Sequence, residues 1–391
     1  MKNITFIIPT KNRSVFIARL LNYYRDLEFQ GVLAIGDSSN GDSLEKNKIL
    51  VESLSSKLNI IYREFPDLNS ASTCIELNKL VKTPYVALLN DDDIIIPNGV
   101  QQCIKFLENN PDYSAAHGVG ISIKTPNSIP HGKIIKCVKK KIPVAEGETA
   151  AERFVNAIVE VSDVHHSVHR SAIFSLHFSN SYPIMKNSYI SDHAFVLWFS
   201  QMHAFICGKV KELDMLYIVR HIQDNNSLWH KSLNDVYNWI SSPVWYSNLE
   251  TYKNSIVKGL AKYDKLSLEN AQNAFDQGFF AYLSVWFYQG VYRDNREVSK
   301  FIDFHHKSVI FPYLPHIADN KITKKFRYLH YRMRIYFRKF WCQLIRGEPL
   351  NDNILNKMTN IVLPSLLNER SKYHKDFLPI YKSITNPSKI G

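Results

Sequence analysis

The chain has 391 residues, of which 45% are hydrophobic and 13% aromatic, and it carries a formal net charge of +12. This length suggests two domains, and this composition excludes a disordered, collagen-like or low-complexity chain. The positive charge suits nucleic acid, anionic lipid, a diphosphate-bearing small molecule or a plain solvated surface, and by itself it does not choose among them.

The five cysteines are widely spaced and form no CxxC pair, which argues against a disulfide framework or a structural zinc site. The first residues, MKNITFIIPTKNR, predict a strand and a polar loop rather than a signal peptide. No apolar run is long enough to predict a membrane-spanning helix. We therefore expect a cytoplasmic protein.

The N-terminal part alternates predicted strands and helices. Strands are predicted at Ile4–Ile8, Val32–Ile35, Asn59–Tyr62 and Tyr85–Leu89. Helices are predicted at Ser14–Arg25, at Asp42–Lys57 and from Asn69 or Ser70 to Val81, each capped by its first residue. This alternation predicts right-handed βαβ units and a mostly parallel sheet. Ligands bind beyond the carboxyl ends of such strands, so three polar loops should converge there, namely Thr10–Arg13, Gly36–Gly41 and Asn90–Asp93.

The middle of the chain mixes both kinds of element. Helices are predicted at Pro97–Asn110, Thr149–Val161 and Asp192–Gln201, strands at Tyr113–Val119, Ala204–Cys207 and Met215–Val219, and a basic loop or hairpin at His131–Lys141. After Ser227, Trp, Tyr, Lys and Asn recur at helical spacing. We therefore predict an α/β domain over residues 1–228 and a helical C-terminal domain over residues 229–391.

Three adjacent carboxylates, Asp91, Asp92 and Asp93, follow the fourth predicted strand. Such a cluster is costly at a partly buried site unless a cation relieves the repulsion. Mg²⁺ or Mn²⁺ would do so through oxygen ligands, so all three are candidate metal ligands. The alternative is a solvated acidic loop before the helix that begins near Pro97.

The segments TFIIPTKNR, IGDSSNGDS and YVALLNDDDIIIP, in this order, resemble family 2 glycosyltransferases of the GT-A fold over roughly residues 1–227. The resemblance implies a GT-A type, mostly parallel sheet flanked by helices, followed by a helical C-terminal domain. It implies an enzyme that uses a nucleotide diphosphate sugar. The residues that it implies for nucleotide binding are Pro9, Thr10, Arg13, Asp37, Asn90, Asp91 and Asp92.

The register of the aspartate motif stays open. The family form Asp-x-Asp-Asp aligns Asn90, Asp92 and Asp93, whereas a plain Asp-x-Asp selects Asp91 and Asp93. Either register leaves a ribose contact and a metal contact on this loop, without saying which carboxylate makes which.

The resemblance also implies a catalytic base. Family members carry an acidic pair at the start of a later helix, and YISDHAFVLWF matches it at Asp192, with Ser191 where Glu is frequent. An acceptor hydroxyl needs a positioned carboxylate to take its proton. The alternative role of Asp192 is a first-turn charge that favours the helix dipole.

Basic residues in two further segments are candidates for the diphosphate or the acceptor. Arg220 and His221 follow the strand Met215–Val219, where relatives carry cations near the diphosphate, although they also suit a surface strand end. In DVHHSVHRS, we favour structural or acceptor-lining roles for the histidines, His166 in particular, over a zinc site.

The segment 324–346 is basic and aromatic, with an apolar stripe at near-helical spacing from Phe326 to Leu344. This pattern is typical of a helix on an anionic membrane surface, which would place the protein peripherally on the inner face of the membrane. It is also typical of a core-packed helix with a solvated basic face.

Together these features predict an inverting, metal-dependent transfer of a sugar to a hydroxyl of a glycan, a lipid-linked glycan or a protein. One alternative is a sugar nucleotidyltransferase, which needs a glycine-rich loop that PTKNR lacks. The other is a non-catalytic basic protein that binds nucleic acid, but no nucleic-acid motif is present. The sequence does not name the donor sugar, the base, the acceptor or the oligomeric state.

Overall fold

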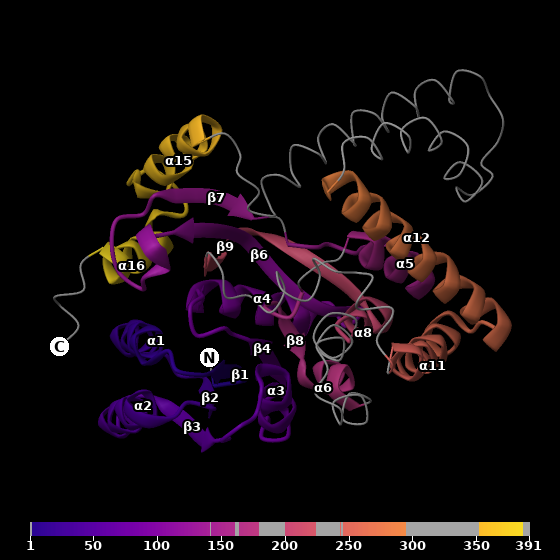
Figure 1. Cartoon of the computed structure of the whole chain (residues 1–391), viewed down its shortest axis with the longest axis horizontal. Coiled ribbons are helices and arrows are strands. Elements are labelled where there is room, and N and C mark those ends of the chain that lie inside the picture. Colours follow the sequence, from indigo (N-terminus) through magenta and orange to yellow (C-terminus); the bar gives the residue numbers. More distant parts are fainter. Residues whose placement is uncertain are drawn as a thin grey trace.

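The computed structural model describes residues 2–140, 142–160, 164–179, 200–223, 243, 245–294 and 352–385. These residues build a nine-stranded sheet in the order β3-β2-β1-β4-β8-β6-β9-β5, with β7 paired to β6 (Figure 1). Buried apolar clusters lie on both sides of this sheet. The expected α/β class is confirmed.

The N-terminal half of the sheet is parallel, because β2 pairs with β3 and β1, and β1 pairs with β4. The strands are β1 (Ile4–Thr10), β2 (Val32–Asp37), β3 (Asn59–Glu64) and β4 (Tyr85–Leu88). The connecting helices are α1 (Ser14–Asp26), α2 (Gly41–Leu54) and α3 (Ser70–Asn78). Parallel strands joined by helices bring their carboxyl ends to one edge of the sheet.

Strand β1 shows why the strands in the N-terminal half of the sheet have continuous apolar sequences. Phe6 and Ile8 face one buried cluster, while Ile7 faces the other. A strand buried on both faces needs apolar side chains at successive positions rather than an alternating pattern. Two-sided burial therefore explains the continuous run at Ile4–Ile8.

The other half of the sheet is mixed. The strands are β5 (Ile94–Ile95), β6 (Tyr113–Lys124), β7 (Lys136–Lys140), β8 (Val168–Arg170) and β9 (Lys209–His221). Strand β8 is antiparallel to β4 and β6, β7 is antiparallel to β6, and β5 is antiparallel to β9. Only β6 and β9 run parallel among the described strands of this half.

The remaining helices pack in two groups. They are α4 (Pro97–Asn109), α5 (Ala150–Glu160), α6 (Ser171–Ser179), α8 (Met202–Cys207), α11 (Trp245–Asp264), α12 (Leu268–Asp294), α15 (Asp352–Leu367) and α16 (His374–Thr385), with a 3-10 turn at Pro126–Ser128. Helices α11 and α12 pack on α5, whereas α15 packs on β7 and α16 on α1. Figure 1 shows these two pairs at opposite ends of the molecule.

One predicted element is wrong. Ala204–Cys207 lies in the helix α8, not in a strand. A short run of buried apolar residues satisfies either structure, so periodicity cannot separate them. Val168–Arg170 form the short strand β8, and Ser171–Ser179, for which we predicted no element, form α6.

Other expectations hold in part. The segment His131–Lys141 supplies a hairpin strand, β7, rather than only a loop. Asn69 caps α3 by accepting from the Ser72 amide at 2.9 Å. Ser14, however, is the first residue within α1, and Arg13 stands at the N-cap without a side-chain cap bond.

Candidate active site

The loops after β1 and β2 are hydrogen-bonded to each other. The Asn12 amide donates to the Ser39 hydroxyl at 2.7 Å, and the Asn40 amide donates to the Asn12 side-chain oxygen at 3.0 Å. Asn12 has a φ of 56°, in the left-handed region that asparagine tolerates better than most residues. The two loops therefore form one rim at the carboxyl edge of the sheet.

The third loop joins this rim through Asp91 and Asp92. The Thr10 hydroxyl donates to Asp91 Oδ2 at 2.8 Å. Arg13 bridges both carboxylates, with Nε 3.2 Å from Asp91 Oδ1 and Nη2 2.9 Å from Asp92 Oδ2. The structure thus brings together Thr10, Arg13 and the aspartates that the sequence had assigned to one site.

Asp93 has different partners, on the far side of the loop. Arg220 Nε donates to its Oδ2 at 2.9 Å, and the His221 amide donates to its Oδ1 at 3.0 Å. The Asn90 side chain donates from Nδ2 to Oδ2 at 3.2 Å, and Nε2 of His166 lies 4.0 Å from the same oxygen. Asp93 therefore ties the aspartate loop to the end of β9.

The three carboxylates differ in acidity because their surroundings differ. Burial, reinforced by the charge of Asp92, raises the pKa of Asp91 to about 7. Burial and the neighbouring Asp93 raise the pKa of Asp92 as well. Burial alone would raise the pKa of Asp93 too, but Arg220, His166, Lys140 and the His221 amide together outweigh burial and hold that pKa below its ordinary value. Asp91 and Asp92 are the pair that an added cation would stabilise most.

Asp37 lies at the end of β2 and is only 1% exposed. The Ser39 amide donates to its Oδ1 at 2.8 Å, and Asn47 and the Tyr62 hydroxyl each donate to its Oδ2 at 2.7 Å. Three donors hold this carboxylate rigidly at the rim. The neighbouring Gly36 makes this possible, since an added Cβ would lie 2.4 Å from a Thr73 methyl of α3.

A buried arginine that the sequence analysis did not single out also belongs to the site. Arg19 is 1% exposed and donates through Nη2 to the Asp92 carbonyl at 2.5 Å. Burial lowers its pKa to about 10. Its signal in the sequence is a charged residue between the buried Ile17 and Leu20 of an otherwise amphipathic helix.

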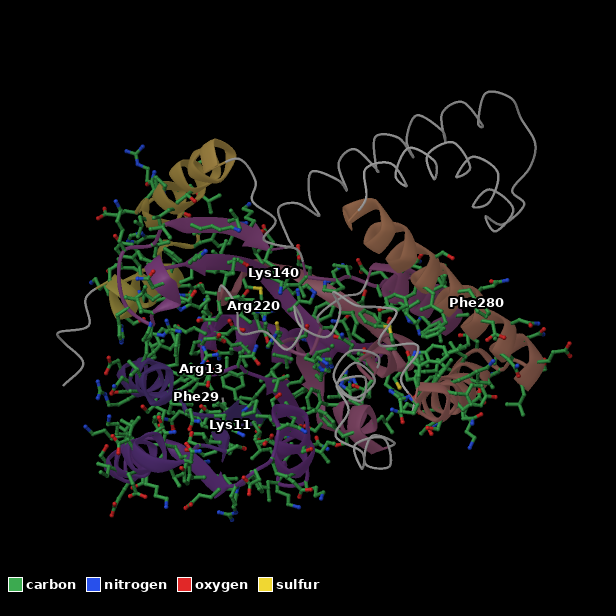
Figure 2. All side chains as sticks on the ribbon, in the orientation of Figure 1. Lys11, Arg13, Phe29, Lys140, Arg220 and Phe280 are labelled. Atoms are coloured by element: carbon green, nitrogen blue, oxygen red, sulfur yellow. The ribbon has the colours of Figure 1, made fainter. Side chains whose placement is uncertain are left out.

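The predicted basic residues divide into two kinds. Figure 2 labels Arg220 and Lys140, which both act electrostatically on Asp93 from the ends of β9 and β7. The His221 side chain instead faces Arg19 and Thr125, at 3.0 and 2.9 Å, and burial lowers its pKa to about 3. Pro9 is part of β1, opposite Gly36 of β2.

The histidines of DVHHSVHRS are buried. His166 donates from Nδ1 to the Leu88 carbonyl at 2.8 Å, which turns Nε2 towards Asp93. His169 donates from Nε2 to the Val164 carbonyl at 2.8 Å. Across the described ranges, no group of three or more His, Cys, Asp or Glu side chains is arranged to hold a metal ion.

Two predicted features lie outside the described residues, namely the candidate base Asp192 and the basic segment 324–346. Among the helices that the structure does describe, none is both long and apolar enough to cross a membrane.

Comparison with known proteins places the site in a family. Residues 5–166, which include all three loops, match the family described as Glycosyl transferase family 2. No curated protein matches the chain.

Among solved structures, the chain is similar to S. aureus TarS 1-349 in complex with UDP-GlcNAc, at 16% identity and a TM-score of 0.45, over 73% of each chain. It is also similar to S. aureus TarS, at 14% identity and a TM-score of 0.38, over 73% of this chain and 55% of that one. The family assignment rests on the N-terminal match rather than on these distant structures. Residues 5–166 are therefore identified as a family 2 glycosyltransferase domain.

Proposed function

We propose that this enzyme transfers a sugar from a nucleotide diphosphate sugar to a hydroxyl acceptor, with inversion at the anomeric carbon. The observation that carries the proposal is the aspartate loop in the matched domain. Three carboxylates stand between Arg13, at the N-terminus of α1, and Arg220, at the end of β9. A site that holds arginines beside adjacent carboxylates suits a ligand that brings its own negative charge and a counter-ion.

The nucleotide would lie along the rim formed by the first two loops. Asp37 has one oxygen, Oδ1, that accepts only the Ser39 amide, so it retains capacity for a donor of a base or ribose. Thr10 and Arg13 would contact the nucleotide beside it, together with Pro9 and Asn90. A nucleotide phosphate would compete with Asp91 and Asp92 for the guanidinium of Arg13.

A divalent metal fits this donor set. Mg²⁺ prefers carboxylate oxygens, and at nucleotide sites one or two carboxylates plus substrate phosphates commonly complete its shell. Asp91 and Asp92 supply such oxygens, and burial raises the pKa of both carboxylates although Arg13 contacts each of them. Asp93 is already neutralised by Arg220, so we assign it a lesser part. Bound Mg²⁺ or Mn²⁺ would supply stabilisation of charge on the diphosphate leaving group.

The chain's own residues would perform the transfer around that diphosphate. Arg220 lies where a cation can offset leaving-group charge as it develops, a term that is worth most in a water-poor site. His166 faces the same region from the turn before β8 and would line the diphosphate or the acceptor. Asp192 would take the proton of the acceptor hydroxyl, which would then attack from the face opposite the diphosphate. The acceptor class that we propose is a glycan, a lipid-linked glycan or a protein.

Calorimetry on the full chain tests this proposal. UDP, GDP and UDP-GlcNAc are titrated with Mn²⁺ and again with EDTA. A ligand at 100 times its dissociation constant stabilises the folded state by about 2.7 kcal/mol, so a thermal-shift screen can extend the search to other nucleotide sugars. We expect binding that needs Mn²⁺ and that is lost in Asp91→Ala and Asp92→Ala.

The matched control is Asp112→Ala, which removes a carboxylate that is 57% exposed and pairs with Lys209 away from the site. It should bind like the wild type. Affinity unchanged by EDTA would exclude the metal, and no binding by any nucleotide diphosphate or its sugar would exclude the proposed function.

A further inference from the structure

Arg19 is the largest side chain among those that the structure buries almost completely. A guanidinium taken out of water is costly unless its donors find acceptors in good geometry. Arg19 projects from α1, the helix whose N-terminus also carries Arg13. An apolar side chain would fill this space without the cost of burying a charge. The presence of a buried arginine here therefore indicates a role beyond filling the core.

The acceptors of Arg19 come from three separate segments. Nη2 donates to the Asp92 carbonyl in the aspartate loop at 2.5 Å. Nη1 donates to the Pro130 carbonyl, in the turn after β6, at 2.8 Å, and to His221 Nδ1, at the end of β9, at 3.0 Å. One rigid planar group thus makes hydrogen bonds to three separate chain segments.

The contact with His221 has a defined direction. A guanidinium has donors but no acceptors, so Nδ1 of His221 must accept and Nε2 must carry the proton. Nε2 lies 2.9 Å from the Thr125 hydroxyl, which in turn donates to the Ile129 carbonyl at 2.5 Å. This series of hydrogen bonds ends in the same turn that Arg19 contacts through Pro130, while Nε of Arg19 makes no hydrogen bond to any of the described residues.

Asp92 is thereby held twice from α1. Its carbonyl accepts from Arg19, and its carboxylate pairs with Arg13 at 2.9 Å. The ring of Phe16 lies between the two guanidinium groups, 4.2 Å from that of Arg13 and 5.3 Å from that of Arg19. A rotation of the aspartate loop would break all of these contacts together.

We propose that Arg19 is a positioning residue that fixes the aspartate loop against the end of β9, so that the loop is preformed for the nucleotide diphosphate. The proposal rests on the proposed function and deepens it. It assigns the shape of the loop to a residue that touches its backbone rather than its carboxylates. Misplacement of binding groups by about 1 Å has large effects, which is the error that losing this contact would allow.

The test uses two variants of the full chain, Arg19→Met and Arg19→Lys, with Arg25→Met as the control from the same helix. Lysine keeps the positive charge but lacks the planar guanidinium group that reaches three acceptors at once. UDP affinity is measured with Mn²⁺ by calorimetry, with GDP as the second probe. Both variants should bind about tenfold or more weakly, while Arg25→Met binds like the wild type. If Arg19→Met does not fold, Arg19→Lys decides.

Nitrogen-15 NMR of histidine-labelled protein tests the Arg19–His221 contact directly, and the rescue of UDP affinity by lysine or its absence tests the positioning role. His221 is assigned by its loss in His221→Gln. Its Nδ1 should be unprotonated and its Nε2 protonated in the wild type, and this single tautomer should be lost in the Arg19 variants. Arg25→Met should keep it.

The outcomes separate the two proposals. Wild-type UDP affinity in both Arg19 variants, with binding lost in Asp91→Ala, overturns the positioning role alone. A wild type that binds neither UDP nor GDP, nor any nucleotide diphosphate sugar, overturns the proposed function and this inference with it. An unchanged His221 tautomer in the variants overturns the claim that Arg19 fixes the tautomer of the His221 ring.

Discussion

Three identical side chains in one loop have different roles because their partners differ. Asp91 and Asp92 share Arg13, whereas Asp93 has Arg220 and a backbone amide to itself. The ionised form of Asp93 is therefore stabilised by the fold, while that of Asp91 is opposed by it. Residue identity alone could not distinguish them.

This difference predicts opposite effects of neutral substitutions. Asp93→Asn should lower the free energy of unfolding by about 3 kcal/mol at pH 7, because it removes the charge that pairs with Arg220 in a mostly buried site. Asp91→Asn should leave that free energy unchanged or raise it, because it removes an unfavourable charge, yet it should abolish Mn²⁺-dependent nucleotide binding. Denaturant unfolding and calorimetry measure the two quantities. Equal destabilisation by both variants would contradict this assignment.

A second prediction concerns Asp37. Asp37→Ala should weaken nucleotide binding and also destabilise the protein by about 3 kcal/mol, because the donors from Asn47 and Tyr62 lose their shared acceptor. Asn47→Ala is the matched control, since it disturbs the same cluster but keeps the carboxylate. If Asp37→Ala lowers stability without lowering affinity, Asp37 is a structural residue of the turn only.

At the scale of elements, the site is completed by a helix from the far end of the chain. Helix α16 accepts from the Gly132 amide at the Ile384 carbonyl, at 2.8 Å, and lies 3.0 Å from His131 at the Ser383 carbonyl. Both contacts hold the turn that Arg19 reaches through Pro130. The helix therefore supports the aspartate loop indirectly.

Phe377→Ala tests this support. Phe377 is fully buried in the cluster on which α16 packs, so truncation should cost about 3–5 kcal/mol of stability. If α16 supports the loop, UDP affinity should also fall under conditions where the variant is still folded by circular dichroism. Phe275→Ala, in α12 on the other cluster, is the control: a similar loss of stability there should leave affinity unchanged.

The elements β8, α6 and α8 carry a group of buried histidines, which predicts acid sensitivity. Burial lowers the pKa of His169 to about 3 and holds the pKa of His177 and of His203 below the ordinary value. In the unfolded chain these groups titrate near 6.5, so below that pH the unfolded state binds protons that the folded state does not. Stability should then fall as the pH drops from about 6.5, by up to about 1.4 kcal/mol per pH unit for each histidine.

Urea midpoints between pH 5 and pH 7 measure this slope. His169→Gln keeps a donor for the Val164 carbonyl but does not titrate, so its midpoint should depend less steeply on pH than that of the wild type. Parallel pH dependence in the two proteins would show that His169 does not contribute.

For the whole molecule, the net charge of +12 and the segment 324–346 keep the membrane prediction open to test. If that segment forms a basic amphipathic helix at a membrane surface, the protein should sediment with anionic vesicles, less with neutral ones, and salt should release it. Replacing Arg332, Arg334, Arg338 and Lys339 with Gln should abolish sedimentation without lowering the melting temperature. A wild type that ignores anionic vesicles at low salt would assign the helix to the protein core.

The division into residues 1–228 and 229–391 also stays a proposal at this scale. The described C-terminal helices contact the N-terminal part at two separate places, α11 and α12 on α5 and α15 and α16 on β7 and α1. Such contacts are typical of helices that pack onto the N-terminal domain rather than of a separate C-terminal domain.

The sequence by itself determined the features that depend on neighbours along the chain. Continuous apolar runs predicted the buried strands, and amphipathic patterns predicted the helices between them. The polar loops at the carboxyl ends of the strands predicted where Thr10, Arg13 and the aspartates would meet. The same local patterns failed at Ala204–Cys207, where burial is equally consistent with a helix and a strand.

Only the tertiary structure decided which partner each charge receives. Arg19 and His221 are 202 residues apart, and Asp93 and the His221 amide are 128 apart, so no local pattern links them. These contacts set the acidity of the carboxylates and the shape of the loop, because charges and donors in a buried site respond to whatever the fold places within a few ångströms.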